Sequence, residues 1–233
     1  MGIALVTGAS RGIGKATALQ LAREGYTVAV NYHHNIKAAT DVINQIVEAG
    51  GKAFAVRADI SDEAQVLAMF ESLDREGEPL TALVNNAGIL FEQSTIENLS
   101  AERINRVLAT NVTGYFLCCR EAVKRMSFKH GGKGGAIVNV SSAASKGAVD
   151  SLTTGLSLEV AAQGIRVNCV RPGLIYTDIH ASGGEPGRVD RVKALLPMQR
   201  GGQPEEVAQA IVWLLSEKAS YVTGSFIELA GGK

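Results

Sequence analysis

A glycine-rich run follows the first apolar segment of this chain with no residue between them. Ile3–Val6 is wholly apolar, residues 7–14 read Thr-Gly-Ala-Ser-Arg-Gly-Ile-Gly, and helical spacing begins at Ile13, Thr17 and Leu21. Glycines between a strand and a helix let the backbone turn tightly and approach an anion at the helix N-terminus, where free N–H groups and the helix dipole favour negative charge. The GxxxGxG spacing differs from the common GxGxxG fingerprint, but the placement predicts a dinucleotide-binding loop. The alternative is a glycine-rich turn that binds nothing.

Short apolar runs recur along the chain and alternate with longer amphipathic stretches. Each is expected to form a strand buried on both faces: Ile3–Val6, Thr27–Val30, Ala53–Val56, Ala82–Val84, Ala136–Val140, Val167–Val170 and Phe226–Leu229. Gly25, Gly50 and Gly164 mark helix ends, and Pro204 followed by two acids marks a helix start. Strands alternating with helices predict a parallel sheet with right-handed crossovers. We therefore expect an α/β fold, with residues 1–233 forming a single doubly wound, Rossmann-type domain around a seven-stranded parallel sheet.

The composition argues against several classes of partner and location. Lys plus Arg and Asp plus Glu each number 23, so the formal net charge is zero and no basic surface for nucleic acid or an anionic membrane is expected. The three cysteines form no CxxC pair, which is typical of a reduced cytoplasmic protein. Because the first strand is expected to begin at Ile3, we expect no signal peptide, and no apolar run is long enough to span a bilayer.

Five further motifs, in order along the chain, resemble those of the short-chain dehydrogenase/reductase family. They are Asn-Asn-Ala-Gly at residues 85–88, Asn111 in Asn-Val-Thr-Gly, Ser142 closing Ile-Val-Asn-Val-Ser-Ser, Lys146 in Ala-Ser-Lys, and Pro172-Gly173 with Thr177. The resemblance covers essentially the whole chain, and it is similar for sugar dehydrogenases and 3-oxoacyl reductases, between which it does not choose. It implies an oxidoreductase that transfers a hydride between a nicotinamide cofactor and a secondary alcohol or carbonyl, with an unknown small-molecule substrate.

The resemblance also implies which residues hold the cofactor. They lie in the glycine loop, near the ends of several strands and on one helix: Gly8, Ser10, Arg11, Gly12, Ile13, Gly14, Asn31, His33, Asp59, Ile60, Asn86, Ala87, Gly88, Lys146, Pro172, Gly173, Ile175 and Thr177. Among them, Asp59 resembles the residue that hydrogen-bonds the adenine amino group. Capping of a helix over residues 61–74 is the alternative role for this carboxylate.

The end of the second strand bears on the choice between NADP(H) and NAD(H). A carboxylate there would accept hydrogen bonds from the adenosine ribose 2′-hydroxyl and repel a 2′-phosphate, but residues 31–34 read Asn-Tyr-His-His. Arg11 offers a forked donor to a phosphate, which Asn31, His33 or His34 could supplement. The sequence therefore predicts NADP(H) over NAD(H). The alternative for Arg11 is a solvated surface arginine.

Proton transfer in the resembling family is carried by a tyrosine beside a lysine. A phenol ordinarily titrates at about 10, and a nearby ammonium favours the phenolate. By resemblance, Lys146 supplies the ammonium and holds the nicotinamide ribose, Ser142 hydrogen-bonds the substrate oxygen, and Asn111 anchors a water that relays protons to solvent. Each has a structural alternative: Asn111 could bond only to backbone, Ser142 could cap a strand end, and Lys146 could lie in solvent.

The tyrosine itself is absent from the interval where the family carries it. It should stand four residues before Lys146, one helical turn away, yet that position is Ser142, and the five tyrosines lie elsewhere, at Tyr26, Tyr32, Tyr115, Tyr176 and Tyr221. The family usually separates the serine from the tyrosine by about a dozen residues. Either the molecule carries a further segment with the tyrosine, joined near residues 143–145, or the deletion is genuine and leaves a regulatory or interaction protein that binds NADP without turnover. We expect the first, because every other motif is intact.

Metal binding and assembly leave weaker signals. His33-His34 and Cys118-Cys119 are adjacent pairs whose side chains point in different directions, and without a further ligand cluster we expect no metal site. Long helices are expected over Leu99–Met126 and Lys146–Gln163. In the resembling family these two helices pair with their copies across a dyad, and residues 224–232 make a second interface. The resemblance implies a homotetramer, with a dimer as the alternative.

The substrate is expected beneath the region Ser182–Leu195. Gly-rich residues 182–187 lie between helical pieces and could form a mobile lid. A partly apolar wall is expected from Ile179, His180, Leu195 and Met198. Substrate identity does not follow from these residues, because variable loops set specificity in such folds.

Overall fold

The expected strands form and align in one parallel sheet. The computed structural model describes residues 1–141 and 146–232, with only the backbone of Lys146, and in it the strand order is β3-β2-β1-β4-β5-β6-β7. The strands are β1 (Ile3–Val6), β2 (Thr27–Tyr32), β3 (Lys52–Arg57), β4 (Leu80–Asn85), β5 (Gly135–Val140), β6 (Ile165–Pro172) and β7 (Phe226–Leu229). Every pair of neighbours is parallel. The predicted doubly wound α/β fold is confirmed.

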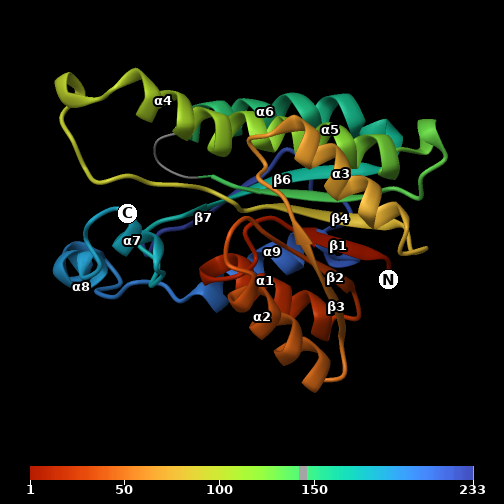
Figure 1. Cartoon of the computed structure of the whole chain (residues 1–233), viewed down its shortest axis with the longest axis horizontal. Helices are drawn as coiled ribbons and strands as arrows, with labels where there is room; N and C mark the ends of the chain where they lie inside the picture. Colours follow the sequence, from red (N-terminus) through yellow and green to blue (C-terminus); the bar gives the residue numbers. More distant parts are fainter. Residues whose placement is uncertain (142–145, 233) are drawn as a thin grey trace.

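Helices cover both faces of the sheet (Figure 1). One face carries α1 (Gly12–Arg23), α2 (Ile36–Glu48) and α9 (Pro204–Leu215), and the other carries α3 (Glu63–Asp74), α4 (Ala101–Leu108), α5 (Gly114–Met126) and α6 (Lys146–Val160). The short helices α7 (Ile179–Ser182) and α8 (Arg188–Val192) stand beyond the carboxyl ends of the strands, on the side opposite the N-terminus. Ligands of doubly wound sheets bind at this end.

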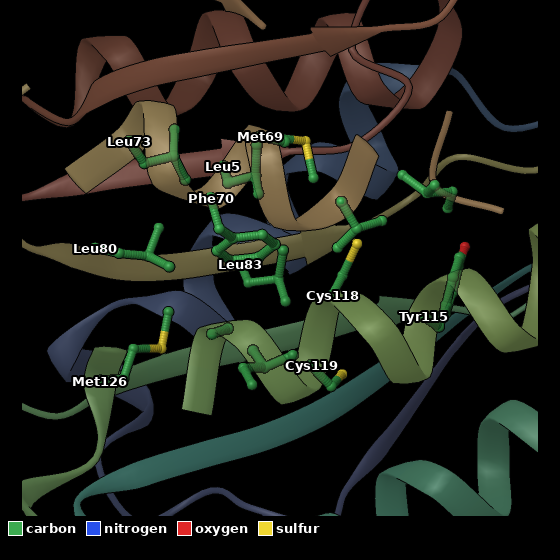
Figure 2. Packing of buried hydrophobic residues seen from close by; sticks show 14 of the residues in the cluster. Leu5, Met69, Phe70, Leu73, Leu80, Leu83, Tyr115, Cys118, Cys119 and Met126 are labelled. Carbon is green, nitrogen blue, oxygen red and sulfur yellow. The ribbon is translucent and has the colours of Figure 1, made fainter. Parts of the chain in front are cut away.

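Two apolar layers hold the helices on the sheet. Successive strand side chains point to opposite faces, so Leu5 packs in the layer with Met69 and Phe70 of α3 (Figure 2), whereas Val6 packs in the layer with Leu21 of α1. All five side chains are at most 1% exposed. Burying each of the large ones contributes about 1.5–3 kcal/mol.

Two strands differ from the expectation of burial on both faces. β3 and β7 lie at the two edges of the sheet, and Ala55 and Glu228, within the runs expected to be buried, are exposed. A short apolar run looks alike at an edge and at the centre of a sheet, so the sequence could not separate the two cases.

Three glycines and one proline mark helix ends and a helix start as expected. Gly25, Gly50 and Gly164 have φ of +89°, +82° and +77°, as expected after helix ends. Pro204 opens α9, where the Glu206 carboxylate accepts a 2.7 Å hydrogen bond from the backbone N–H of Gln203.

Three expected helices have different bounds in the structure. The helix expected over 61–74 begins at Glu63 and is capped by Asp62. The helix expected over Leu99–Met126 is divided by a π-helical turn at Ala109–Thr113. The α-helical part of Lys146–Gln163 ends at Val160, and a 3₁₀ turn follows.

Candidate functional site

The glycines of the loop allow it to pack closely against neighbouring segments of the protein. Gly8 and Gly12 have φ of +62° and +53°, which disfavour side chains. A Cβ at Gly14 would lie 2.4 Å from the carbonyl oxygen of Gly8 and 2.5 Å from Nδ2 of Asn86. A Cβ at Gly12 would lie 3.3 Å from Cγ2 of Thr177. The loop is therefore a tight glycine turn at the N-terminus of α1. Free backbone N–H groups at such a helix start fit the pyrophosphate of a dinucleotide.

The end of β4 is hydrogen-bonded to this loop. Asn86 Nδ2 donates to the carbonyl oxygens of Thr7 and Gly8, at 2.9 and 3.2 Å. The Thr7 hydroxyl accepts from the backbone N–H groups of Asn86 and Ala87, at 2.9 and 3.0 Å. Thr7, which is wholly buried, was not among the predicted site residues, and its position directly before Gly8 was the signal that could have found it.

Asn31 does not offer its side chain to a ligand. It is 2% exposed, its Oδ1 accepts from the Gly8 N–H at 3.1 Å, and its Nδ2 donates to the carbonyl oxygens of Val56 and Ala58, both at 3.2 Å. The side chain thus fixes the glycine loop to β3. The expectation that Asn31 itself supplements a phosphate contact is corrected, because its amide is already hydrogen-bonded inside the protein.

His33 and Asp59 meet at the ends of β2 and β3. Nε2 of His33 lies 3.7 Å from Oδ2 of Asp59, and the His33 ring stacks on His34 with centroids 3.5 Å apart. Oδ1 of Asp59 accepts from the backbone N–H and the hydroxyl of Ser61, at 2.9 and 2.7 Å. The alternative role of Asp59 as a helix cap is corrected, since Asp62 caps α3.

Arg11 extends from the glycine loop across to the segment that follows β6. The side chain is exposed, and its Nη2 donates to Oγ of Ser182 in α7 at 3.4 Å. Together with the approach of Gly12 to Thr177, this contact joins two predicted cofactor segments that are far apart in the sequence. Ser182 was predicted only as the start of a lid region.

The loop after β6 is fixed against the C-terminal segment. Gly173 donates its N–H to the carbonyl oxygen of Leu229 at 3.0 Å, and a Cβ there would lie 2.8 Å from Cα of Ala230. Ile175, 4% exposed, lines a cavity of about 420 Å³. The cavity also contacts Leu174, Leu196, Met198, Arg200, Gly202, Glu206, Val207, Glu228, Leu229, Ala230, Gly231 and Gly232.

Only one residue of the predicted substrate wall lines this cavity. Met198 does so. Leu195 is 82% exposed, while its neighbour Leu196 is buried. Nε2 of His180 lies 2.8 Å from the carbonyl oxygen of Ile175, so the ring is hydrogen-bonded within its own loop. Ile179 is half-buried and is not part of the cavity wall.

Asn111 lies in the π-helical turn between α4 and α5, 4% exposed. Its Nδ2 donates to the carbonyl oxygen of Ile89 at 3.0 Å, and its Oδ1 accepts from the Ile89 N–H at 2.9 Å. The side chain therefore has the backbone role that was the alternative. The Asn111 side chain also positions the segment that follows Gly88. A Cβ added at Gly88 would lie 3.5 Å from Oδ1 of Asn111. Ile60 is buried against Gly114 beside this turn.

The centre of the predicted catalytic group lies partly outside the described residues. This applies to Ser142 and to the side chain of Lys146; the backbone of Lys146 begins α6. Among the described tyrosines, Tyr115 donates its hydroxyl to the carbonyl oxygen of Val140 at 3.1 Å, and burial raises its pKa. Tyr176 donates to Asp190 at 3.0 Å, which also raises its pKa. Because both pKa values are raised, neither phenol has the environment that favours a phenolate near neutral pH.

Residues 1–141 and 146–232 hold neither a metal-ligand cluster nor a membrane-spanning helix. Within these ranges no group of three or more His, Cys, Asp or Glu side chains could hold a metal ion. None of the helices described there combines the length and the apolar character needed to cross a bilayer. The three cysteines are free and buried, and burial raises the pKa of Cys119 and of Cys169 to about 12.

Comparison with known proteins gives matches along nearly the whole chain. A family model described as enoyl-(acyl carrier protein) reductase matches residues 8–233. An uncharacterized oxidoreductase of Escherichia coli, YgfF, is 75% identical over 247 positions that cover all of both chains. Glucose 1-dehydrogenase 2 of Bacillus subtilis is 38% identical, covering 98% of this chain and 93% of its own. The 3-oxoacyl-[acyl-carrier-protein] reductase FabG of Staphylococcus aureus is 36% identical, covering 98% and 96%.

A solved structure agrees with these relatives. A short-chain type dehydrogenase/reductase from Mycobacterium marinum superposes with a TM-score of 0.92 at 35% identity, covering 99% of this chain and 94% of that one. The chain belongs to the short-chain dehydrogenase/reductase family, and it is an oxidoreductase of the class that acts on CH–OH groups with a nicotinamide cofactor. The predicted family and class are confirmed.

Proposed function

We propose that this protein is an NADP(H)-dependent oxidoreductase that interconverts a secondary alcohol and a carbonyl in a small molecule. The observation that carries the proposal is the hydrogen-bonded unit of the glycine loop, Asn31 and Asn86 at the N-terminus of α1. Its glycines allow the tight turn before α1, and the helix N-terminus is where a dinucleotide pyrophosphate would lie. When bound, the cofactor supplies or accepts a hydride, which is the redox step of the reaction.

The charges around the ends of β2 and β3 support the preference for NADP(H). Arg11 is exposed at the loop, and no acidic residue stands at positions 31–34. The nearby carboxylate, Asp59, hydrogen-bonds Ser61 through Oδ1 and faces His33 through Oδ2. Both oxygens of this carboxylate therefore have partners within the protein. We propose that Arg11 binds the 2′-phosphate and that His33 assists it.

We further propose that the molecule carries a tyrosine segment between Ser142 and Lys146. The alignment with the Escherichia coli relative spans 247 positions and covers all 233 residues of this chain, so at least 14 of its positions have no residue here. That number is in keeping with the dozen or so residues that the resembling family places in this interval. In the proposed mechanism the tyrosine exchanges a proton with the substrate oxygen, the Lys146 ammonium lowers the tyrosine pKa, and Ser142 hydrogen-bonds the same oxygen.

Assembly is proposed from exposed apolar side chains on the helices that the family pairs. Ile104 of α4, Phe116 of α5 and Leu158 of α6 are 40%, 48% and 79% exposed. Covering them with a second copy would remove apolar surface from water. We propose a homotetramer, with a dimer as the alternative, formed by chains that are each one cofactor-binding domain. The free cysteines are in keeping with a cytoplasmic location.

Two measurements on the protein isolated from its own cells test this function. The first is the dissociation constant for NADPH and for NADH, and the second is cofactor oxidation with a panel of ketones, 3-oxoacyl thioesters and sugars. The proposal predicts tighter NADPH binding and turnover of at least one carbonyl. Silence across the panel with intact NADPH binding would favour the regulatory or interaction protein without turnover. Sedimentation at the mass of one chain would overturn the proposed assembly.

A further inference from the structure

Arg171, near the end of β6, joins three elements through one planar side chain. Its Nε and Nη2 donate to the two oxygens of Asp150 in α6, at 3.3 and 2.7 Å. Its Nη1 donates to Glu228 of β7 at 2.7 Å. The guanidinium carbon lies 4.1 Å from the ring centroid of Phe226, also in β7. A forked, stacked guanidinium has its orientation fixed by every one of these contacts.

Asp150 lies one helical turn after Lys146, the first residue of α6. We infer that Arg171 is a positioning residue that acts through Asp150. The pair fixes the axial position and rotation of the first turn of α6, and therefore the backbone position of Lys146. The inference rests on the proposed function, in which Lys146 holds the cofactor ribose and acts on the tyrosine. Arg171 also directly precedes Pro172 and Gly173, so one residue anchors the lysine helix and a proposed cofactor loop together.

The buried face of α6 has a second polar contact with the sheet. Thr153 Oγ1 accepts from Nδ2 of Asn139 in β5 at 3.0 Å, and Oδ1 of Asn139 accepts from Nδ2 of Asn85 in β4 at 2.9 Å. All three residues are 0% exposed. Thr153 follows Asp150 by three residues, so the two contacts hold α6 at different heights along its axis.

Polar contacts of this kind restrict a helix in a way that apolar packing does not. Val149 and Leu152 are buried beside Asp150, but non-directional apolar contacts tolerate small sliding and rotation. Hydrogen bonds weaken steeply when their geometry is lost. Because a misplacement of about 1 Å in a catalytic group can cost about 100-fold in rate, the Arg171–Asp150 pair has a functional consequence beyond its contribution to stability.

The test compares Asp150→Asn and Arg171→Lys with a matched control. The control is Asp74→Asn, because Asp74 of α3 receives a similar forked pair from Arg125 of α5, with both distances 2.7 Å, away from the proposed site. The two test variants are expected to raise the NADPH dissociation constant roughly three- to tenfold and to speed amide hydrogen exchange over residues 150–153. The control is expected to lower the unfolding midpoint and to leave both readouts as in the wild type.

The outcomes separate this inference from the proposed function. Test variants that bind NADPH like the wild type, with unchanged exchange over residues 150–153, would overturn the positioning role. If the control weakened NADPH binding as much as the test variants do, the effect would be one of general stability, and the inference would also be wrong. A wild-type protein that does not bind NADPH would contradict the proposed function, while hydrogen exchange in α6 would still test the positioning of the helix.

Discussion

The Oδ1 atom of Asn31 accepts a 3.1 Å hydrogen bond from the backbone N–H of Gly8, deep at the junction of β2 and the glycine loop. The same side chain donates to two carbonyl oxygens near the end of β3. One buried amide therefore fixes the position of the glycine loop relative to β2 and β3. The structure gives Asn31 a supporting role for either dinucleotide, since no part of its amide is left for a 2′-phosphate.

Replacing Asn31 with alanine tests this supporting role. Asn31→Ala removes three side-chain hydrogen bonds, with the Gly8 N–H and with the carbonyl groups of Val56 and Ala58, which is expected to cost on the order of 1–3 kcal/mol of unfolding free energy. NADPH and NADH binding should weaken by the same factor, because the loop moves for both. Chemical denaturation and binding titrations measure these effects, and a selective loss of NADPH affinity would instead favour direct phosphate contact.

Replacing Arg11 tests the choice of cofactor. Arg11→Ala removes the proposed charge-assisted contact with the 2′-phosphate, so the NADPH dissociation constant should rise roughly tenfold or more. NADH has no such phosphate, and its affinity should stay within about twofold, as no charged contact is lost. Arg23→Ala, at the other end of α1, serves as the control for loss of one positive charge. An unchanged preference for NADPH in Arg11→Ala would contradict the assignment.

A side chain at Gly14 should displace the glycine loop from its position beside Asn86. In Gly14→Ala the new Cβ would meet the Gly8 carbonyl oxygen at 2.4 Å, and overpacking of this kind costs about 1–3 kcal/mol. Binding of both dinucleotides should fall with stability. Gly187→Ala is the control, since nothing lies within 4 Å of its Cβ position and its φ is −86°. If fluorescence titration gave equal affinities for Gly14→Ala and the wild type, the loop would not be the dinucleotide-binding segment.

Glu121 of α5 should make stability depend on pH. Burial raises the pKa of its carboxyl, but hydrogen bonds from Lys124, Arg125 and Arg120 outweigh this effect and hold the pKa below its usual value of 4.5. A carboxyl whose pKa is lower in the folded than in the unfolded state stabilises the fold at pH values above 4.5. This stabilisation is lost as the pH falls through the pKa of the folded state. Glu121→Gln should therefore be less stable than the wild type at pH 7, and the gap should narrow in acid. Denaturation curves across pH 3 to 7 measure it, and a gap that stays constant would refute this origin.

The sequence predicted the structure correctly where local patterns determine it. It did not predict contacts between segments that are far apart in the chain. Apolar runs and the glycine loop predicted the strands and their sheet because burial and turn geometry are read locally. The π-helical turn around Asn111 lies within a stretch whose apolar residues have ordinary helical spacing. The sequence therefore did not predict an interruption there. A phosphate contact was predicted for Asn31, but its side chain bonds the glycine loop and the end of β3, which the local sequence does not reveal. Leu195 and Leu196 are adjacent and identical in type, and only the packing determines which one is buried.

The interval between Ser142 and Lys146 decides whether the protein carries its general acid. The intact mass of the protein isolated from its own cells tests this most directly. The sequence as printed has a mass of 24.5 kDa. A further 14 residues of the same mean mass add about 1.5 kDa. We predict a mass higher than 24.5 kDa by this order, with tyrosine in the added segment. A mass of 24.5 kDa would contradict the proposed tyrosine segment and leave a dinucleotide-binding protein without its general acid, a group worth about 10² to 10⁴ in rate.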